Sequence, residues 1–233
     1  MKSYEFNLQQ LDRVANALGD LLPRVTFVGG CTTALLVDEA AYFGVRETED
    51  VDVIVDVATL VEYYRFGQKL RDLKFREDPD GVICRWLFED EVMNLKLDVM
   101  PIDEEILGFS NRWYEEAINE ANSITLPSGT VIRVVSPSYF IATKFEAFKG
   151  RGKGDFFSHD LEDIVFVLEN RSRFILELAK CSDELKTYFA SQATSLLNDD
   201  FLNVLPGLLN NSESTGPVVD TLKIMKSWSA EEA

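Results

Sequence analysis

Between Thr48 and Asp56 the chain reads T-E-D-V-D-V-I-V-D, and this stretch constrains the fold more than any other. Valines at alternate positions are typical of a β-strand with one buried face, which places Asp50 and Asp52 together on the other face. Two such carboxylates repel each other, and any burial disfavours their charged forms. A divalent cation between them would remove this cost, and Mg²⁺ is the cation that oxygen ligands favour. An edge strand with one solvated acidic face is the simpler alternative.

A glycine pair, Gly29-Gly30, lies about twenty positions earlier. Residues 23–28 before it have the pattern of a strand, and residues 31–36 after it have a helical pattern that we expect to continue to about residue 43. A glycine pair between a strand and a helix lets a phosphate approach backbone N–H groups and the positive end of the helix. Ordinary tight turns also use glycine pairs, so this signal depends on the acidic strand that follows.

A third acid, Asp98, lies between Leu97 and Val99 in a segment, 95–100, that alternates as a strand. Three carboxylates on neighbouring strands, beside a glycine-rich phosphate loop, describe a site for two-metal nucleotidyl transfer. The sequence therefore predicts a phosphate-binding site with acidic metal ligands.

These motifs resemble those of the DNA-polymerase-β-like nucleotidyltransferase superfamily: Val28-Gly29-Gly30, then Asp50-Val51-Asp52, then Asp98. The resemblance implies an α/β (α+β) nucleotidyltransferase fold, with a mixed sheet flanked by helices and a helical C-terminal domain. It also implies an NTP substrate and two Mg²⁺ ions. The residues it assigns to metal and catalysis are Asp50, Asp52 and Asp98, and those it assigns to the triphosphate are Gly29, Gly30 and Thr32.

Arg46 and Thr48 precede the acidic pair as Arg-x-Thr, a spacing that is similar to the one found in related toxins. The resemblance implies that both residues lie near the nucleotide, where a guanidinium can bind phosphate through two hydrogen bonds. A solvated loop arginine among many acids is the alternative for Arg46.

The chain changes character at Ser136-Pro137, beyond which nearly every segment has a helical pattern. We expect a nucleotidyltransferase domain at 1–135 and a helical domain at 136–233. The second domain contains the one basic, glycine-rich loop, K-G-R-G-K-G-D at 149–155. An exposed connection between helices would have the same composition, but a triphosphate also needs cationic partners. The cations available there are Lys144, Lys149, Arg151 and Lys153.

Lys144, Arg151 and the Asp-x-x-Asp of Asp160 to Asp163 resemble the C-terminal motif of AbiEii-type toxin nucleotidyltransferases. The resemblance implies that Lys144, Lys149 and Arg151 bind the nucleotide and that Asp160 serves catalysis. It further implies transfer to RNA, such as a tRNA end, within a toxin–antitoxin or abortive-infection system with an antitoxin partner. One position departs from the motif, because His159 stands where the family carries arginine. His159 is the single histidine of the chain. The simpler interpretation is that it is structural or faces solvent.

The net charge of −17 over 233 residues opposes nonspecific binding of nucleic acid, which requires basic surface. A small-molecule nucleotidyltransferase of the aminoglycoside-modifying kind is therefore an alternative, since an acidic cleft attracts polycations. A non-catalytic binding protein of the same fold is a second alternative. Three widely spaced cysteines form no disulfide or zinc pattern, and no run of residues is apolar enough to span a membrane or to resemble a signal peptide. We expect a reduced, cytoplasmic protein.

The remaining segments have simple patterns. We expect a helix at 7–22 that is capped by Asn7 and covers the sheet, and a helix at 59–73 with Leu60 and Tyr64 among its core positions. Strands at 82–88 and 93–100 should pair through a connection at 89–91. Further helices are expected at 111–121, 138–148, 158–168, 174–179, 183–197, 201–209 and 218–228, a hairpin at 124–126 and 131–135, and a polar linker at 210–217.

Overall fold

The structure is a computed structural model that describes residues 2–89 and 94–228. The chain forms two compact units: Met1–Leu35 with Val45–Phe140, and Leu36–Gly44 with Ile141–Ala233. The expected division at 135 differs from these units in two ways. The first unit continues to Phe140, and the short segment Leu36–Gly44 belongs to the second unit.

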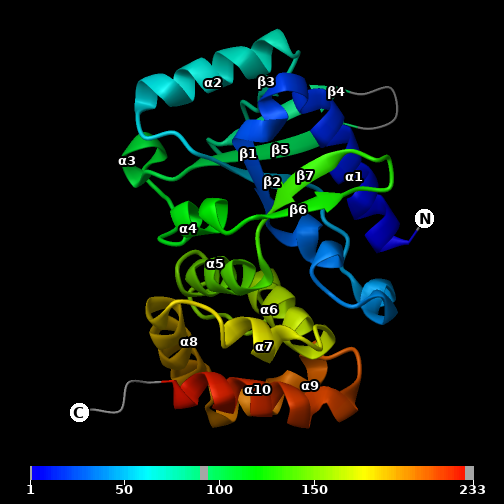
Figure 1. Cartoon of the computed structure of the whole chain (residues 1–233), viewed down its shortest axis with the longest axis vertical. Helices are drawn as coiled ribbons and strands as arrows, with labels where there is room; N and C mark the ends of the chain where they lie inside the picture. Colours follow the sequence, from blue (N-terminus) through cyan, green and yellow to red (C-terminus); the bar gives the residue numbers. More distant parts are fainter. Residues whose placement is uncertain (1, 90–93, 229–233) are drawn as a thin grey trace. The chain divides into compact units, whose positions relative to one another are not determined.

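The first unit is built on a mixed, seven-stranded sheet with the strand order β3-β4-β5-β2-β1-β7-β6 (Figure 1). Strands β2 and β5 are parallel neighbours, as are β1 and β7, and the other pairs are antiparallel. A mixed sheet with flanking helices confirms the predicted fold class. The strands are β1 Val25–Val28, β2 Val51–Val55, β3 Arg76–Glu77, β4 Arg85–Glu89, β5 Asn94–Pro101, β6 Asn122–Thr125 and β7 Val131–Val134.

Register decides which face of the sheet each side chain occupies. Val51 lies beside Leu97, and Leu97 lies beside Trp86, so these apolar side chains share one face. Helix α2, Leu60–Asp72, packs there: Tyr63 donates a 2.9 Å hydrogen bond to the Val99 carbonyl, and Trp86 lies against Gly67. The acidic residues therefore occupy the opposite face.

Helix α2 begins where the sequence predicts, with Thr59 accepting a hydrogen bond from the Glu62 N–H as the N-cap. Two of its predicted core positions are wrong, because Leu60 and Tyr64 are exposed. The buried face of the helix is formed by Tyr63, Phe66 and Leu70 instead. Leu60 and Tyr64 lie outside this face.

Helix α1 runs from Ser3 to Leu18, so the prediction that Asn7 caps it is wrong. Asn7 is a buried residue inside the helix. Its amide donates to the Arg46 carbonyl at 2.8 Å and accepts from the Thr48 N–H at 3.1 Å. Gln10, one turn later, donates to the Thr48 carbonyl. These bonds attach the segment that enters β2 to helix α1.

The α-helix expected over 31–43 is also wrong. Two short 3₁₀ helices, η2 Gly30–Leu35 and η3 Glu39–Gly44, take its place. Backbone groups between them bind elsewhere: the Leu36 carbonyl accepts from Arg171, and the Asp38 N–H donates to the Asn170 carbonyl. Because these tertiary partners satisfy the backbone, a continuous helix is not formed there.

The described part of the second unit is helical. Its elements are η3, most of α5 Pro137–Lys149, then α6 His159–Asn170, α7 Phe174–Leu178, α8 Asp183–Leu196, α9 Asp199–Leu208, η4 Ser212–Ser214 and α10 Thr215–Ser227. Helix α10 begins at Thr215, inside the segment that was expected to be a linker. At the start of that segment, the Asn210 and Asn211 N–H groups both donate to the Glu169 carboxylate.

The first unit also contains η1 Gly19–Arg24, which replaces the end of the expected helix at 7–22 and the start of the expected strand at 23–28. Helices α3 Glu104–Leu107 and α4 Tyr114–Asn119 follow β5, and α4 is shorter than the helix expected at 111–121. Positions 90 and 91 of the expected hairpin connection lie outside the described residues. Within residues 2–89 and 94–228, no helix has the length and apolar character needed to cross a membrane.

We predict that Asn7→Ala lowers the free energy of unfolding by about 1–3 kcal/mol, because it leaves the buried Thr48 N–H and the Arg46 carbonyl without their partner. Urea denaturation measures this change. Asn16→Ala, at an exposed position of the same helix, is the control and should change it by less than about 0.5 kcal/mol. Equal effects of the two variants would show that Asn7 is an ordinary helix position.

Candidate active site

Three adjacent strands place polar side chains side by side on the face of the sheet opposite to α2. Asp98 of β5 is the register partner of Asp52 on β2 and of Arg85 on β4. Asp50, two residues before Asp52, points to the same face. We call Asp50, Asp52 and Asp98 the acid row. The predicted convergence of the three acids therefore follows from the strand order and register.

A cation that the sequence motifs do not assign, Arg85, is bound to the acid row. The Arg85 guanidinium donates from Nε to Asp98 Oδ1 and from Nη2 to Asp98 Oδ2, both at 2.8 Å. The same Nη2 donates to Asp50 Oδ2 at 2.6 Å. Hydrogen bonds to Asp98, with the charges of Asp98 and Asp50, raise the pKa of Arg85 against the opposing effect of burial. Arg85 therefore neutralises part of the acid row.

A signal for Arg85 was present in the sequence. It stands between Cys84 and Trp86 in a segment predicted to pair with the strand of Asp98, and a cation in an apolar strand needs a partner. The pairing alone did not give the register. In the structure, Arg85 pairs with Asp98 and Glu89 pairs with Asn94.

Gly29 supports the acid row from the neighbouring strand. Val28 pairs with Asp52, so the next residue, Gly29, lies beside the Asp52 side chain. Gly29 has a φ of +72°, and a Cβ at this position would clash with the Asp52 carboxylate and lie 2.8 Å from its Cβ. Glycine is thus required twice here, once by the backbone conformation and once by the close approach of Asp52.

Thr32 and Gly30, the other predicted phosphate ligands, are buried. Thr32 donates its hydroxyl to the Gly29 carbonyl at 2.8 Å, and its N–H donates to the same oxygen at 3.2 Å. These bonds hold the turn that positions Gly29. Thr48 is buried and attached to α1 through its backbone, while Arg46 donates a long hydrogen bond to the Glu47 carbonyl. Direct contact of these residues with a nucleotide stays a prediction.

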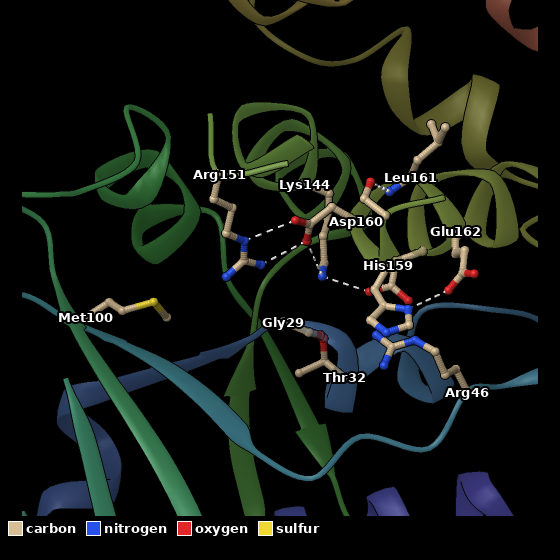
Figure 2. Close-up of polar contacts among 12 residues, drawn as sticks. Gly29, Thr32, Arg46, Met100, Lys144, Arg151, His159, Asp160, Leu161 and Glu162 are labelled. Carbon is tan, nitrogen blue, oxygen red and sulfur yellow. Dashed lines mark hydrogen bonds and ion pairs between the residues drawn. The ribbon is translucent and has the colours of Figure 1, made fainter. Parts of the chain in front are cut away.

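The C-terminal motif forms a compact ion-pair cluster within the second unit (Figure 2). Lys144, on α5, is buried and contacts Asp160 at 3.0 Å and Asp163 at 2.7 Å, both on α6. Arg151, from the glycine-rich loop, donates to both oxygens of Asp160, at 3.1 and 2.9 Å. The predicted association of Lys144, Arg151 and Asp160 is therefore present as direct ion pairs, and their predicted roles toward a nucleotide stay predictions.

The neighbours of Asp160 in this cluster shift its pKa. Burial alone would raise its pKa, but the hydrogen bonds from Arg151 and the charge of Lys144 outweigh burial and lower the pKa below the ordinary value. Asp160 is thus held as a carboxylate between two cations. The exposed His159 contacts Glu162 at 2.7 Å one turn along α6, which agrees with its solvent-facing interpretation, and Lys149 is exposed.

Neither buried cysteine of the first unit is a ready nucleophile. Burial raises the pKa of Cys31 and of Cys84 to about 12, so both are thiols at neutral pH.

The acid row suits a metal ion in its donor chemistry. Carboxylate oxygens of Asp50 and Asp98 already converge on one cation, the guanidinium of Arg85, which marks the position that a metal would compete for. As the side chains stand, no three acidic, histidine or cysteine groups among the described residues are arranged around one metal position. Carboxylate oxygens are the donors that Mg²⁺ prefers, and in the structure Asp50 and Asp98 bind Arg85.

Comparison with known proteins supports the fold. No protein-family model matches the chain, and no curated protein matches it either. Among solved structures, it is similar to an antigenic nucleotidyltransferase-like protein from Paracoccidioides brasiliensis, with 18% identity and a TM-score of 0.54 over 90% of this chain and 99% of that one. At this identity the likeness shows the fold, which is nucleotidyltransferase-like, as the motifs predict. The closer resemblance to AbiEii-type toxins stays a prediction.

We predict that Gly29→Ala destabilises the protein by at least about 1 kcal/mol more than Gly108→Ala. Both glycines have a positive φ, but a Cβ at Gly108 meets no atom within 4 Å, so Gly108 controls for backbone strain. Urea denaturation compares the two. Adding Asp52→Ala to Gly29→Ala should recover part of the difference. Equal losses at the two glycines would contradict the close approach of Asp52.

We predict that Asp160→Asn lowers stability at pH 7 by about 3 kcal/mol, because it leaves Lys144 buried with one partner fewer. Since the folded-state pKa of Asp160 is lowered, its stabilisation is present above the unfolded value of about 3.9 and is lost as the pH falls through the folded pKa. The difference between wild type and variant should therefore shrink below about pH 4.

Urea denaturation between pH 3 and pH 8 tests this pH dependence. Asp183→Asn is the control, since Asp183 is fully exposed on a helix of the same unit. A stability difference for Asp160→Asn that is constant across the pH range would contradict the lowered pKa.

Proposed function

We propose that this protein is a metal-dependent nucleotidyltransferase that moves a nucleoside monophosphate from an NTP to an acceptor hydroxyl. The observation that carries the proposal is the juxtaposition of Asp52 with Asp98 in register and with Gly29 at its side chain, on one face of a nucleotidyltransferase-like sheet. A structural role explains one buried acid with a partner, but it gives no reason for three carboxylates on one face of the sheet, with one of them, Asp52, packed against Gly29.

In the proposed reaction the acceptor oxygen forms a bond to the α-phosphorus, and the bond from that phosphorus to the pyrophosphate oxygen breaks. Asp98, as a carboxylate, would take the proton of the attacking hydroxyl. The turn at Gly29 would let the phosphates approach the backbone. Mg²⁺ held by Asp50, Asp52 and Asp98 would supply charge neutralisation for the phosphates and a lower pKa for the hydroxyl.

The acceptor is proposed to be RNA, such as a tRNA end, and the cellular role to be that of a toxin with an antitoxin partner. This assignment rests on the resemblance of Lys144, Arg151 and Asp160 to the AbiEii-type motif. In that proposal, Lys144, Lys149 and Arg151 serve the nucleotide, with Arg46 and Thr48 near it. One feature favours a second candidate: the net charge of −17 suits a cationic small-molecule acceptor better than RNA.

Incubation of the purified protein with Mg²⁺, each α-labelled NTP, and either total tRNA or an aminoglycoside panel tests the proposal. We expect label on an acceptor with wild type, and at least about a hundredfold less with Asp98→Asn, which keeps the side-chain shape but removes the base. Asp56→Asn is the control, because Asp56 is exposed just beyond the same strand as Asp52 and should leave transfer unchanged.

The acceptor that carries the label separates the two candidates. Label on tRNA supports the toxin-like role, and label on the aminoglycosides supports the small-molecule role. The absence of both transfer and NTP binding in the wild type would contradict the enzymatic proposal and leave a non-catalytic binding role.

A further inference from the structure

Arg85 binds the carboxylate oxygens of Asp50 and Asp98 that the proposed metal ion would need. Its guanidinium makes two hydrogen bonds to Asp98 and one to Asp50, so three of the row's carboxylate oxygens point at this side chain. The Asp98 side chain is 10% exposed and the Arg85 side chain 19% exposed, so these bonds are largely shielded from water. Charge-assisted hydrogen bonds with this two-pronged geometry and this shielding are the strong ones.

We propose that Arg85 is the resident counter-ion of the acid row, that it competes with the divalent cation for these oxygens, and that it thereby sets the affinity of the row for metal. The inference rests on the proposed function for the presence of a metal, but it concerns a residue that the motif does not assign. A metal ion and a guanidinium cannot use the same lone pair at once, so a metal that takes the lone pairs now used by Arg85 must displace it.

The contacts indicate the order of release. Asp50 receives one hydrogen bond from Arg85 and its side chain is 36% exposed, whereas Asp98 receives two and is the more buried. Asp50 is therefore the carboxylate that leaves Arg85 first. Both oxygens of Asp98 are engaged by Arg85, so the proton transfer proposed for Asp98 also requires the guanidinium to move.

Arg85 also stabilises the acid row when no metal is bound. Without it, three carboxylates on adjacent strands would repel one another beside the apolar sheet. Arg85 keeps the row assembled until metal arrives, at the cost of a weaker apparent metal affinity. A metal bound together with its nucleotide phosphates compensates for that cost better than metal alone, because the phosphates add ligands.

Titration with Mn²⁺, followed by electron paramagnetic resonance of the free ion, tests the competition directly. We expect Arg85→Met to bind Mn²⁺ at the acid row at least about tenfold more tightly than wild type, because a competing charge and its hydrogen bonds are removed. Arg76→Met is the matched control. Arg76 makes an exposed ion pair with Glu89 on the same sheet, and its loss should leave Mn²⁺ affinity unchanged.

Two further measurements make the result specific. Asp52→Asn in the Arg85→Met background should abolish the gain, which separates the acid row from the many surface carboxylates. In wild type, addition of Mg²⁺ should shift the Arg85 Nε–H signal in ¹H–¹⁵N spectra and speed its exchange with water, because the bond to Asp98 is disturbed. This spectroscopic measurement is made on the wild type, and a variant is needed only to assign the Arg85 signal.

The outcomes separate this inference from the proposed function. Equal affinity in wild type and Arg85→Met, with binding lost in Asp52→Asn, would overturn the competition while leaving the metal site intact. An unchanged Arg85 signal at saturating Mg²⁺ would overturn it as well. No binding at the row in wild type or in Arg85→Met would overturn the metal site itself, and the inference with it.

Discussion

Three neighbouring carboxylates repel one another, and the arrangement of the first unit offsets this repulsion. Strand order β4-β5-β2-β1 brings Arg85, Asp98 and Asp52 into one row and places Gly29 at its end. Val51, Leu97 and Trp86 point to the other face, where α2 packs. Separation of the two faces lets a strand such as β2 carry a buried core and a polar site in alternate residues.

The second unit also contains buried carboxylates, and there lysine and arginine side chains neutralise them. Lys144 lies between two buried aspartates, and Arg151 closes the group from the glycine-rich loop. Removal of one charge from such a group leaves another unpaired, so the cluster connects α5, α6 and the loop more firmly than exposed pairs would. Arg151, with a side chain that is 74% exposed, is the member that can change partner with least cost.

The acid row could be predicted because local patterns determine it. Alternation around Asp52 fixed the strand, and the apolar neighbours of Asp98 did the same for the second strand. Arg85 could not be assigned in the same way, since its contact with Asp98 depends on a hairpin register that the sequence leaves open. The helix expected after Gly30 is not formed for another reason: the Leu36 carbonyl accepts from Arg171 and the Asp38 N–H donates to the Asn170 carbonyl, so these backbone groups already have partners. Asn7 is a third case, in which a capping residue type serves a buried contact instead.

Anomalous diffraction from crystals grown with Mn²⁺ and a non-hydrolysable NTP analogue tests most directly whether the acid row is a metal–nucleotide site. We expect anomalous peaks bounded by Asp50, Asp52 and Asp98, phosphate density at the turn of Gly29, and Arg85 withdrawn from Asp50. Crystals that contain the analogue but show no peak at the row, with Arg85 still bridging Asp50 and Asp98, would contradict the proposed chemistry.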